Sequence, residues 1–181
     1  TRDGSSEQGV DGRVEAGGFG MQRESIEAGA RSGNMDWLAS GAHFQTDGYR
    51  DHSQAQREQG NAKLRFGLGG DTTFTLVANS FDSPDIQDPL GLTRAQAAAD
   101  PSQAGNNALA YDTRKSVRQN QAGGTLEHRF GDNTLTANLY SGQRAVNQFL
   151  AFSGATTSGG VVDLATSYGG GGLRRTHDGA L

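Results

Sequence analysis

The strongest constraint in this sequence is a strand–turn–strand unit that occurs three times. In the clearest copy, apolar residues alternate with polar or small ones over 64–68 and again over 74–78, on either side of the turn Gly69-Gly70-Asp71. Alternation with a period of two is typical of a strand with one apolar face, and a Gly/Asp-rich turn between two such runs predicts a β-hairpin. The same unit recurs around 131–133 and, more weakly, around 33–36.

The connections between the predicted strands alternate in length. Three or four residues form each turn at 33–36, 69–71 and 131–133, whereas polar segments of many residues are expected at 46–60, 81–110 and 141–160. Within the second long segment, residues 93–99 predict a short helix with Thr93 as its N-cap, ending before Asp100-Pro101. The chain is thus predicted to form about eight strands in an up-and-down meander.

The two faces of these strands differ in chemistry. Lys63, Arg65, Glu127 and Arg129 fall on the polar face, and the other face carries Leu and Phe among many Ala and Gly residues. Hydrophobic residues make up only 33% of the chain, and 28 of its 181 residues are glycine, which is a poor basis for the core of a soluble enzyme. The alternation alone fits either a membrane barrel with a hydrated interior or a soluble β-sheet domain.

Several classes of site are excluded by composition. The chain has no cysteine, so disulfides, zinc fingers and iron–sulfur clusters are ruled out. Its net charge of -4 gives no support for nucleic-acid binding. Setting glycine aside, no apolar run exceeds four residues, far short of the ~20 that a membrane-spanning helix needs. His43, His52, His128 and His177 show no metal-binding spacing, and His128 is expected on the apolar face beside a short turn.

Four segments resemble the barrel of TonB-dependent outer-membrane receptors. They are TRDG at 1–4, TDGYRDHS at 46–53, DPLGLT at 88–93 followed by YDTRKSVRQ at 111–119, and GLRRTH at 172–177. The resemblance keeps the order of these segments and extends over essentially the whole chain. It is nearest to the FecA-like and YncD-like branch, which takes up iron complexes and other scarce cofactors.

The resemblance implies an all-β fold, namely an antiparallel up-and-down transmembrane β-barrel segment with about eight of the barrel's ~22 strands. Residues 1–8 would then be the end of the plug domain and residues 9–181 a partial barrel. Two long unpaired edges would remain, so we expect that this polypeptide alone neither inserts stably nor transports anything.

The implied function is energised uptake of ferric siderophores or similar scarce complexes at the outer membrane of a Gram-negative bacterium. The implied partners are that ligand, outer-membrane lipid, and the TonB complex through an N-terminal part that this chain lacks. No nucleic acid, resident cofactor or metal is expected. Because no bond of the ligand is made or broken, the chain is expected not to be an enzyme.

The predicted long loops are the best place for ligand contacts. The candidates are Tyr49, Arg50 and His52 in one loop, and Arg114, Lys115 and Arg118 near the end of another. Cationic and aromatic groups together suit an anionic, carboxylate-rich or aromatic chelate. The same residues also fit the ordinary rim of a barrel.

Two functions from other classes stay open at this point. One is a small closed porin-like barrel, and the other is a soluble β-rich binding module. The sorting of short turns and long loops favours the two barrel classes over the soluble module.

Overall fold

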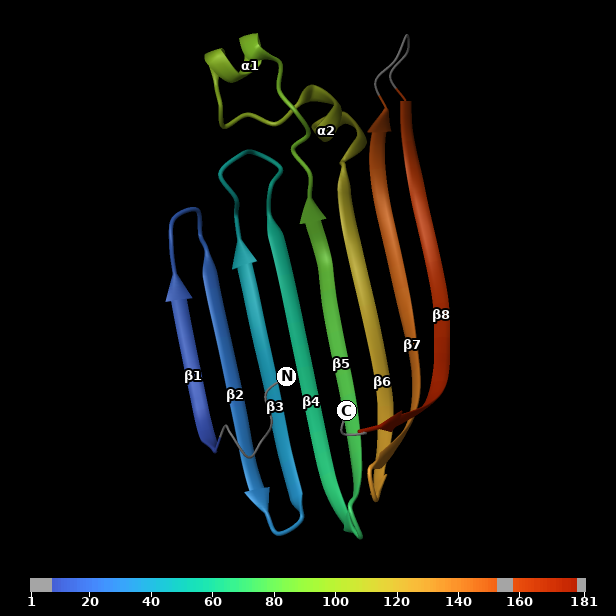
Figure 1. Cartoon of the computed structure of the whole chain (residues 1–181). Helices are drawn as coiled ribbons and strands as arrows, with labels where there is room; N and C mark the ends of the chain where they lie inside the picture. Colours follow the sequence, from blue (N-terminus) through green and yellow to red (C-terminus); the bar gives the residue numbers. More distant parts are fainter. Residues whose placement is uncertain (1–7, 153–157, 179–181) are drawn as a thin grey trace.

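The computed structural model describes residues 8–152 and 158–178 and consists of a single antiparallel sheet with two short helices (Figure 1). Each strand pairs with the next one along the chain, in the order β1 to β8. The strands are β1 (Gly9–Ala16), β2 (Gln22–Ser32), β3 (Met35–Thr46), β4 (Ala55–Gly69), β5 (Thr72–Gln87), β6 (Arg114–Phe130), β7 (Asn133–Phe152) and β8 (Ser158–His177). The expected plug segment at 1–8 lies, except for Gln8, outside the described residues.

The connections are sorted by length between the two ends of the sheet (Figure 1). The β2–β3, β4–β5 and β6–β7 turns lie at what we call the turn end, and the β1–β2, β3–β4 and β5–β6 connections lie at the loop end. Gly33, Gly70, Asp71 and Gly131 take positive φ values of 60°, 54°, 58° and 53°, the left-handed backbone that tight hairpin turns require. The three predicted hairpins and the eight-stranded meander are therefore confirmed.

The predicted long loops are wrong in extent, because the strands continue further than expected. β4 begins at Ala55, β5 runs to Gln87 and β7 runs to Phe152, so residues 141–152 form a strand and not a loop. Within the described residues, the connections at the loop end are the short one at 17–21 and the long ones at 47–54 and 88–113. Near this end the strands carry polar residues on both faces, so the alternation that marks a strand is lost.

The register assigns every strand residue to a face, because directly paired residues project to the same side. The apolar face carries three neighbouring rows of paired residues, which we call the apolar band. Its members are Met35, Phe66, Phe74, Leu126, Ala137 and Leu173, then Trp37, Leu64, Leu76 and Leu139, then Ala39, Ala62, Ala78 and Ala122. Lys63, Arg65, Glu127 and Arg129 lie on the opposite, polar face, as predicted.

Polar groups mark both borders of the apolar band. Toward the turn end, His128 pairs with Thr72, its Nδ1 2.9 Å from the Thr72 Oγ1, and its ring stacks on Phe130. Toward the loop end comes a row of paired residues on the same face, the charged row, made of Glu24, His43, Glu58, Asp82 and Arg118. From Thr72 to Asp82, the strand between these borders is about 34 Å long at ~3.4 Å per residue.

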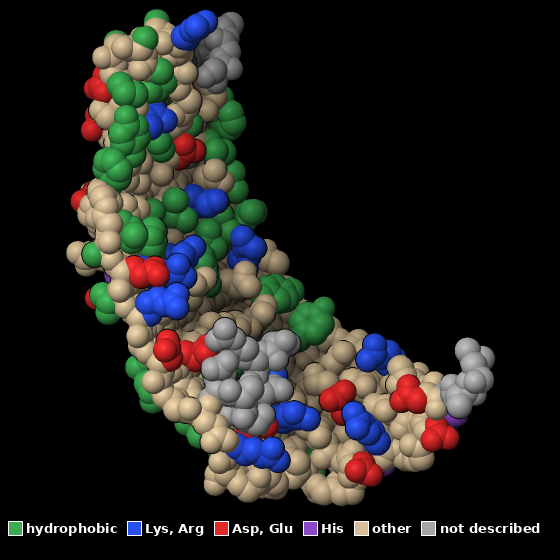
Figure 2. Space-filling view, turned by 60° about the vertical axis from the view of Figure 1, so that its left-hand side comes forward, with side chains coloured by type: hydrophobic (Ala, Val, Ile, Leu, Met, Phe, Trp, Pro, Cys, Tyr) green, Lys and Arg blue, Asp and Glu red, His purple; other side chains and the backbone are tan. Residues whose placement is uncertain are grey.

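The sheet is strongly curved, and Lys, Arg, Asp and Glu side chains are spread among polar ones over the lower part of the surface in Figure 2. On the polar face, tyrosine rings lie over glycines of neighbouring strands. Tyr168 of β8 covers the buried Gly142 of β7, and Tyr140 lies beside Gly123 of β6 and Gly170 of β8. A Cβ at Gly142 or Gly170 would meet a tyrosine ring, and one at Gly123 would crowd the Leu139 carbonyl oxygen and the Tyr140 Cβ, so the glycines are needed for close packing.

Candidate functional site: the loop cap

Residues 47–54 and 88–113 cover the loop end of the sheet, and we call them the loop cap. It contains helix α1 (Arg94–Ala99) and helix α2 (Asn106–Tyr111). In the described residues no helix is long and apolar enough to cross a membrane. α1 confirms the predicted helix: the Thr93 Oγ1 accepts from the Gln96 N–H, and the Gln96 side chain accepts from the Thr93 N–H, which makes a capping box.

The turn after α1 is held by Asp100. The Ser102 hydroxyl and the Ser102 N–H both donate to the Asp100 Oδ1, at 2.5 and 2.8 Å. These two bonds lower the pKa of the Asp100 carboxyl below its usual value, and the bond from the Ser102 hydroxyl has the larger effect. α2 was not predicted, because its N-cap Gly105 offers no side-chain acceptor to mark the start of the helix.

Arg50 joins the two segments of the loop cap. Its guanidinium donates to three backbone oxygens of the other segment, those of Gln103 at 2.9 Å, Leu90 at 2.6 Å and Pro89 at 3.1 Å. The Ser53 hydroxyl accepts from the Arg50 N–H, which fixes the backbone that carries this side chain. Since hydrogen bonds from a charged donor are among the stronger ones, Arg50 is the main polar tie within the cap.

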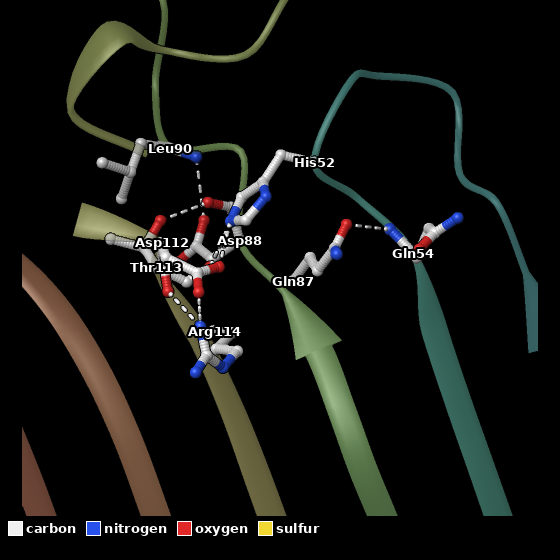
Figure 3. Close-up of polar contacts among 8 residues, drawn as sticks. All are labelled: His52, Gln54, Gln87, Asp88, Leu90, Asp112, Thr113 and Arg114. Carbon is white, nitrogen blue, oxygen red and sulfur yellow. Dashed lines mark hydrogen bonds and ion pairs between the residues drawn. The ribbon is translucent and has the colours of Figure 1, made fainter. Parts of the chain in front are cut away.

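His52 makes a second tie between the same segments (Figure 3). Its Nε2 lies 2.8 Å from the Thr113 carbonyl oxygen and 3.8 Å from the Asp112 Oδ1, and the side chain is only 10% exposed. A ring nitrogen that faces a carbonyl oxygen carries the proton and donates it. His52 and Asp112 both have positive φ, 57° and 50°, so each sits at a sharp bend of its loop.

Further bonds close the cap onto the ends of β4, β5 and β6 (Figure 3). The Asp88 N–H donates to the Thr113 carbonyl, and the Thr113 hydroxyl donates back to the Asp88 carbonyl at 2.6 Å. The Gln54 N–H donates to the Gln87 Oε1 at 3.2 Å. Thr113 is 1% exposed. The Asp88-Pro89 pair was the available sequence signal for this turn, since the Asp88 Oδ1 accepts from the Leu90 N–H.

The structure brings together some of the predicted ligand residues and separates others. Arg114 lies next to the His52 contact, forms an ion pair with Asp112 and sits over the Phe149 ring at 4.2 Å. Tyr49 packs edge-on against Phe19, with ring centroids 5.3 Å apart.

The last two predicted ligand residues lie on opposite faces of β6. Lys115 pairs with Ile86 on the polar face. Arg118 lies in the charged row of the apolar face, where its Nε donates to the Asp82 Oδ2 at 3.2 Å. Tyr49, Arg50 and His52 therefore lie in the loop cap and Arg114 borders it at the start of β6, whereas Arg118 stands apart from them.

The cap is also seated on the sheet through Tyr111, the last residue of α2. A Cβ at Gly159 of β8 would overlap the Tyr111 ring, whereas a Cβ at Gly91 in the cap would meet no atom within 4 Å. We expect Gly159→Ala to displace Tyr111 and to speed amide hydrogen exchange in α2 by about tenfold, in line with the 1–3 kcal/mol that overpacking typically costs. Gly91→Ala is the matched control, and equal exchange rates in the two variants would contradict this packing.

The polar side chains of the cap mainly contact other residues of the cap. Across residues 8–152 and 158–178, no three His, Cys, Asp or Glu side chains gather as they would to hold a metal ion. The strongest acceptors and donors of the cap are used between its own segments. The geometry therefore describes a pre-formed surface above the sheet and not a mobile pair of loops.

No family model matches the sequence. Among solved structures, the chain is similar to the ferric citrate transporter FecA in its unliganded form, with a TM-score of 0.73 and 16% sequence identity. The match covers 95% of this chain and 26% of that one, so the chain spans about a quarter of the length of the structure it matches. At this identity the likeness shows the fold alone: the chain has the fold of a barrel segment of such a transporter.

Proposed function

We propose that the chain is part of the barrel of an outer-membrane TonB-dependent receptor, of the FecA-like and YncD-like branch, that takes up ferric siderophores or similar scarce complexes. In this proposal residues 9–181 belong to the barrel and residues 1–8 to the end of the plug domain. The ligand would be captured at the loop end, and a TonB complex would act on a part of the receptor outside this chain. The chain would make and break no bonds in the ligand.

The observation that carries the proposal is the apolar band with polar borders on one face of the sheet. The strand between the two borders is about 34 Å long, and at a barrel tilt near 40° it rises about 26 Å. This is close to the ~25 Å apolar band of outer-membrane barrels. The charged row and the loop cap then lie beyond the membrane on the loop side, where extracellular loops are expected.

The two other functions make different use of the same sheet. In a soluble module, nothing would require an exposed apolar band to end at a row of charged residues. A closed eight-stranded barrel would have to pair β1 with β8, but within the described residues β1 has 8 residues and β8 has 20. More than half of the free edge of β8 would then lack a partner among the residues of β1, and hydrocarbon does not tolerate an unpaired edge.

The test uses the absence of cysteine from the chain. In the complete protein as its host makes it, we would introduce Ala98→Cys in α1 and, separately, Asp132→Cys in the β6–β7 turn; both positions are exposed. A maleimide that does not cross membranes should label the first in intact cells and the second only after the outer membrane is permeabilised. Equal labelling of both in a soluble fraction would refute the proposal.

A further inference from the structure

A row of neutral amides crosses the middle of the polar face. Asn61 of β4, Asn79 of β5 and Gln121 of β6 are paired across the strands, with Ser40 of β3 at one end. Tyr168 of β8 completes the row by reaching over Gly142. We call Ser40, Asn61, Asn79, Gln121 and Tyr168 the amide row. At ~4.8 Å between strands it extends about 24 Å across the sheet.

The side chains of the amide row hold one another in a fixed orientation. The Tyr168 hydroxyl donates to the Gln121 Oε1 at 2.8 Å, and the Gln121 Nε2 donates to the Asn79 Oδ1 at 3.1 Å. The Asn79 Nδ2 then donates to the Asn61 Oδ1 at 2.7 Å, and the Asn61 Nδ2 donates to the Ser40 hydroxyl oxygen at 3.3 Å. Every bond points the same way along the row, so each strengthens its neighbours.

This arrangement leaves binding capacity at every step. An amide has two N–H donors and an oxygen with two lone pairs, and the row uses one donor and one lone pair of each. The remaining groups face the open side of the sheet, since Asn61 and Gln121 are exposed and Asn79 is half-buried. A ligand with many hydroxyl groups can both donate to and accept from such a row.

Aromatic rings and further amides flank the row on both sides. Gln59, Phe81 and Gln119 pair across β4, β5 and β6 toward the loop end, and Tyr140, 54% exposed, lies toward the turn end. At the β2–β3 end the row opens into a hollow of about 350 Å³ that Ser25, Ser40, Gln59 and Asn61 help to line. The row is uncharged from Ser40 to Tyr168; beyond Ser40 it continues in register into Glu27 of β2 and Asp11 of β1, and Arg13 and Arg23 also line the hollow. Lys63 and Arg144 stand in the neighbouring rows on either side.

We infer that the amide row binds a neutral polyhydroxylated group, of the kind found in sugars, whose hydroxyls meet the amides and whose C–H faces lie on the rings. The row carries no charge, and this favours such a group over an anionic chelate. An anionic chelate would be bound more strongly by cationic side chains than by neutral amides. This inference rests on the proposed function, because it takes the polar face to be the inside of the barrel, and it adds the chemistry of the ligand.

The experiment titrates maltohexaose, and separately citrate, into the complete detergent-solubilised protein by isothermal calorimetry. Maltohexaose should bind to the unaltered protein, and the double variant Asn79→Ala with Gln121→Ala should weaken that binding by about tenfold or more. The matched control is Ser80→Ala with Asn120→Ala, a pair that is hydrogen-bonded at 2.8 Å on the apolar face of the same two strands. The control should bind maltohexaose within about twofold of the unaltered protein.

The readouts separate a binding role from a structural one. Melting temperatures of the two double variants are compared, because a row that only joins strands would lower stability without a specific loss of binding. No binding of maltohexaose, binding of citrate alone, or equal losses in both double variants would overturn the inference. Failure of the cysteine labelling would overturn the proposed function whatever the calorimetry shows, so the two failures are distinguishable.

Discussion

Replacing Ala78 by arginine is expected to cost about 2–4 kcal/mol of stability in the membrane, the typical penalty for a charge on the lipid face of a barrel at mid-depth. Ala78 lies in the apolar band, paired with Ala62 and Ala122. The complete protein should then reach the outer membrane in much smaller amounts. The measurement is urea unfolding in lipid vesicles, followed by the loss of heat-modifiable migration on a gel.

Ala145→Arg is the matched control for that change. Ala145 is also an exposed alanine on the apolar face, but it pairs with Arg118 of the charged row, beyond the apolar band. We expect its cost to be about 0–1 kcal/mol, as found near the membrane interface. If both arginines cost the same, the apolar band does not face lipid, and a soluble sheet becomes the better account.

The second large effect is expected for Arg50→Met, which removes the three bonds between the segments of the loop cap and leaves their carbonyl oxygens without this donor. Hydrogen bonds to a charged group typically contribute 1.5–3 kcal/mol each. Even with strong non-additivity, opening of the cap should become easier by about 3 kcal/mol, or roughly 100-fold. Hydrogen exchange and limited proteolysis at 88–113 measure this directly.

Arg94→Met controls for the loss of charge, because Arg94 is an exposed residue of α1 in the same segment. It should leave exchange in the cap unchanged. The sheet should keep its strand content in both variants, since the strands pair with one another independently of the cap. Protection in Arg50→Met that equals the unaltered protein would mean that the cap is held by other contacts.

The hairpins were predictable because alternation and turn chemistry are local signals. Leu64 and Phe66 report an apolar face within five residues, and Gly70 and Asp71 report the turn between two strands. The continuation of β7 through Gln143 and Arg144 was not predictable, since there both faces of the strand are polar. The position of Trp37 in the sequence does not by itself decide its face, and its pairing with Leu64 places it on the apolar face.

The loop cap shows why site residues are harder to predict than strands. Arg50 was singled out as a cation suited to an anionic ligand, yet its three partners are backbone oxygens 39 to 53 residues away. Backbone acceptors carry no sequence signature, so no pattern could show this use. The amide row has the same difficulty, because Asn61, Asn79 and Gln121 become neighbours only through the register of three strands.

The tyrosine–glycine contacts bear on how a strand with four consecutive glycines finds one alignment. Glycine-rich strands have few side chains to define their pairing and are prone to slip along a neighbour. Tyr140 alone could not prevent a two-residue shift, because it would move from Gly170 to Gly172 and still lie on a glycine. Tyr168 breaks this degeneracy, because the same shift would carry its ring from Gly142 onto Arg144. One ring on each strand, each facing a glycine of the other strand, therefore favours the observed alignment of β8 with β7 over this shift.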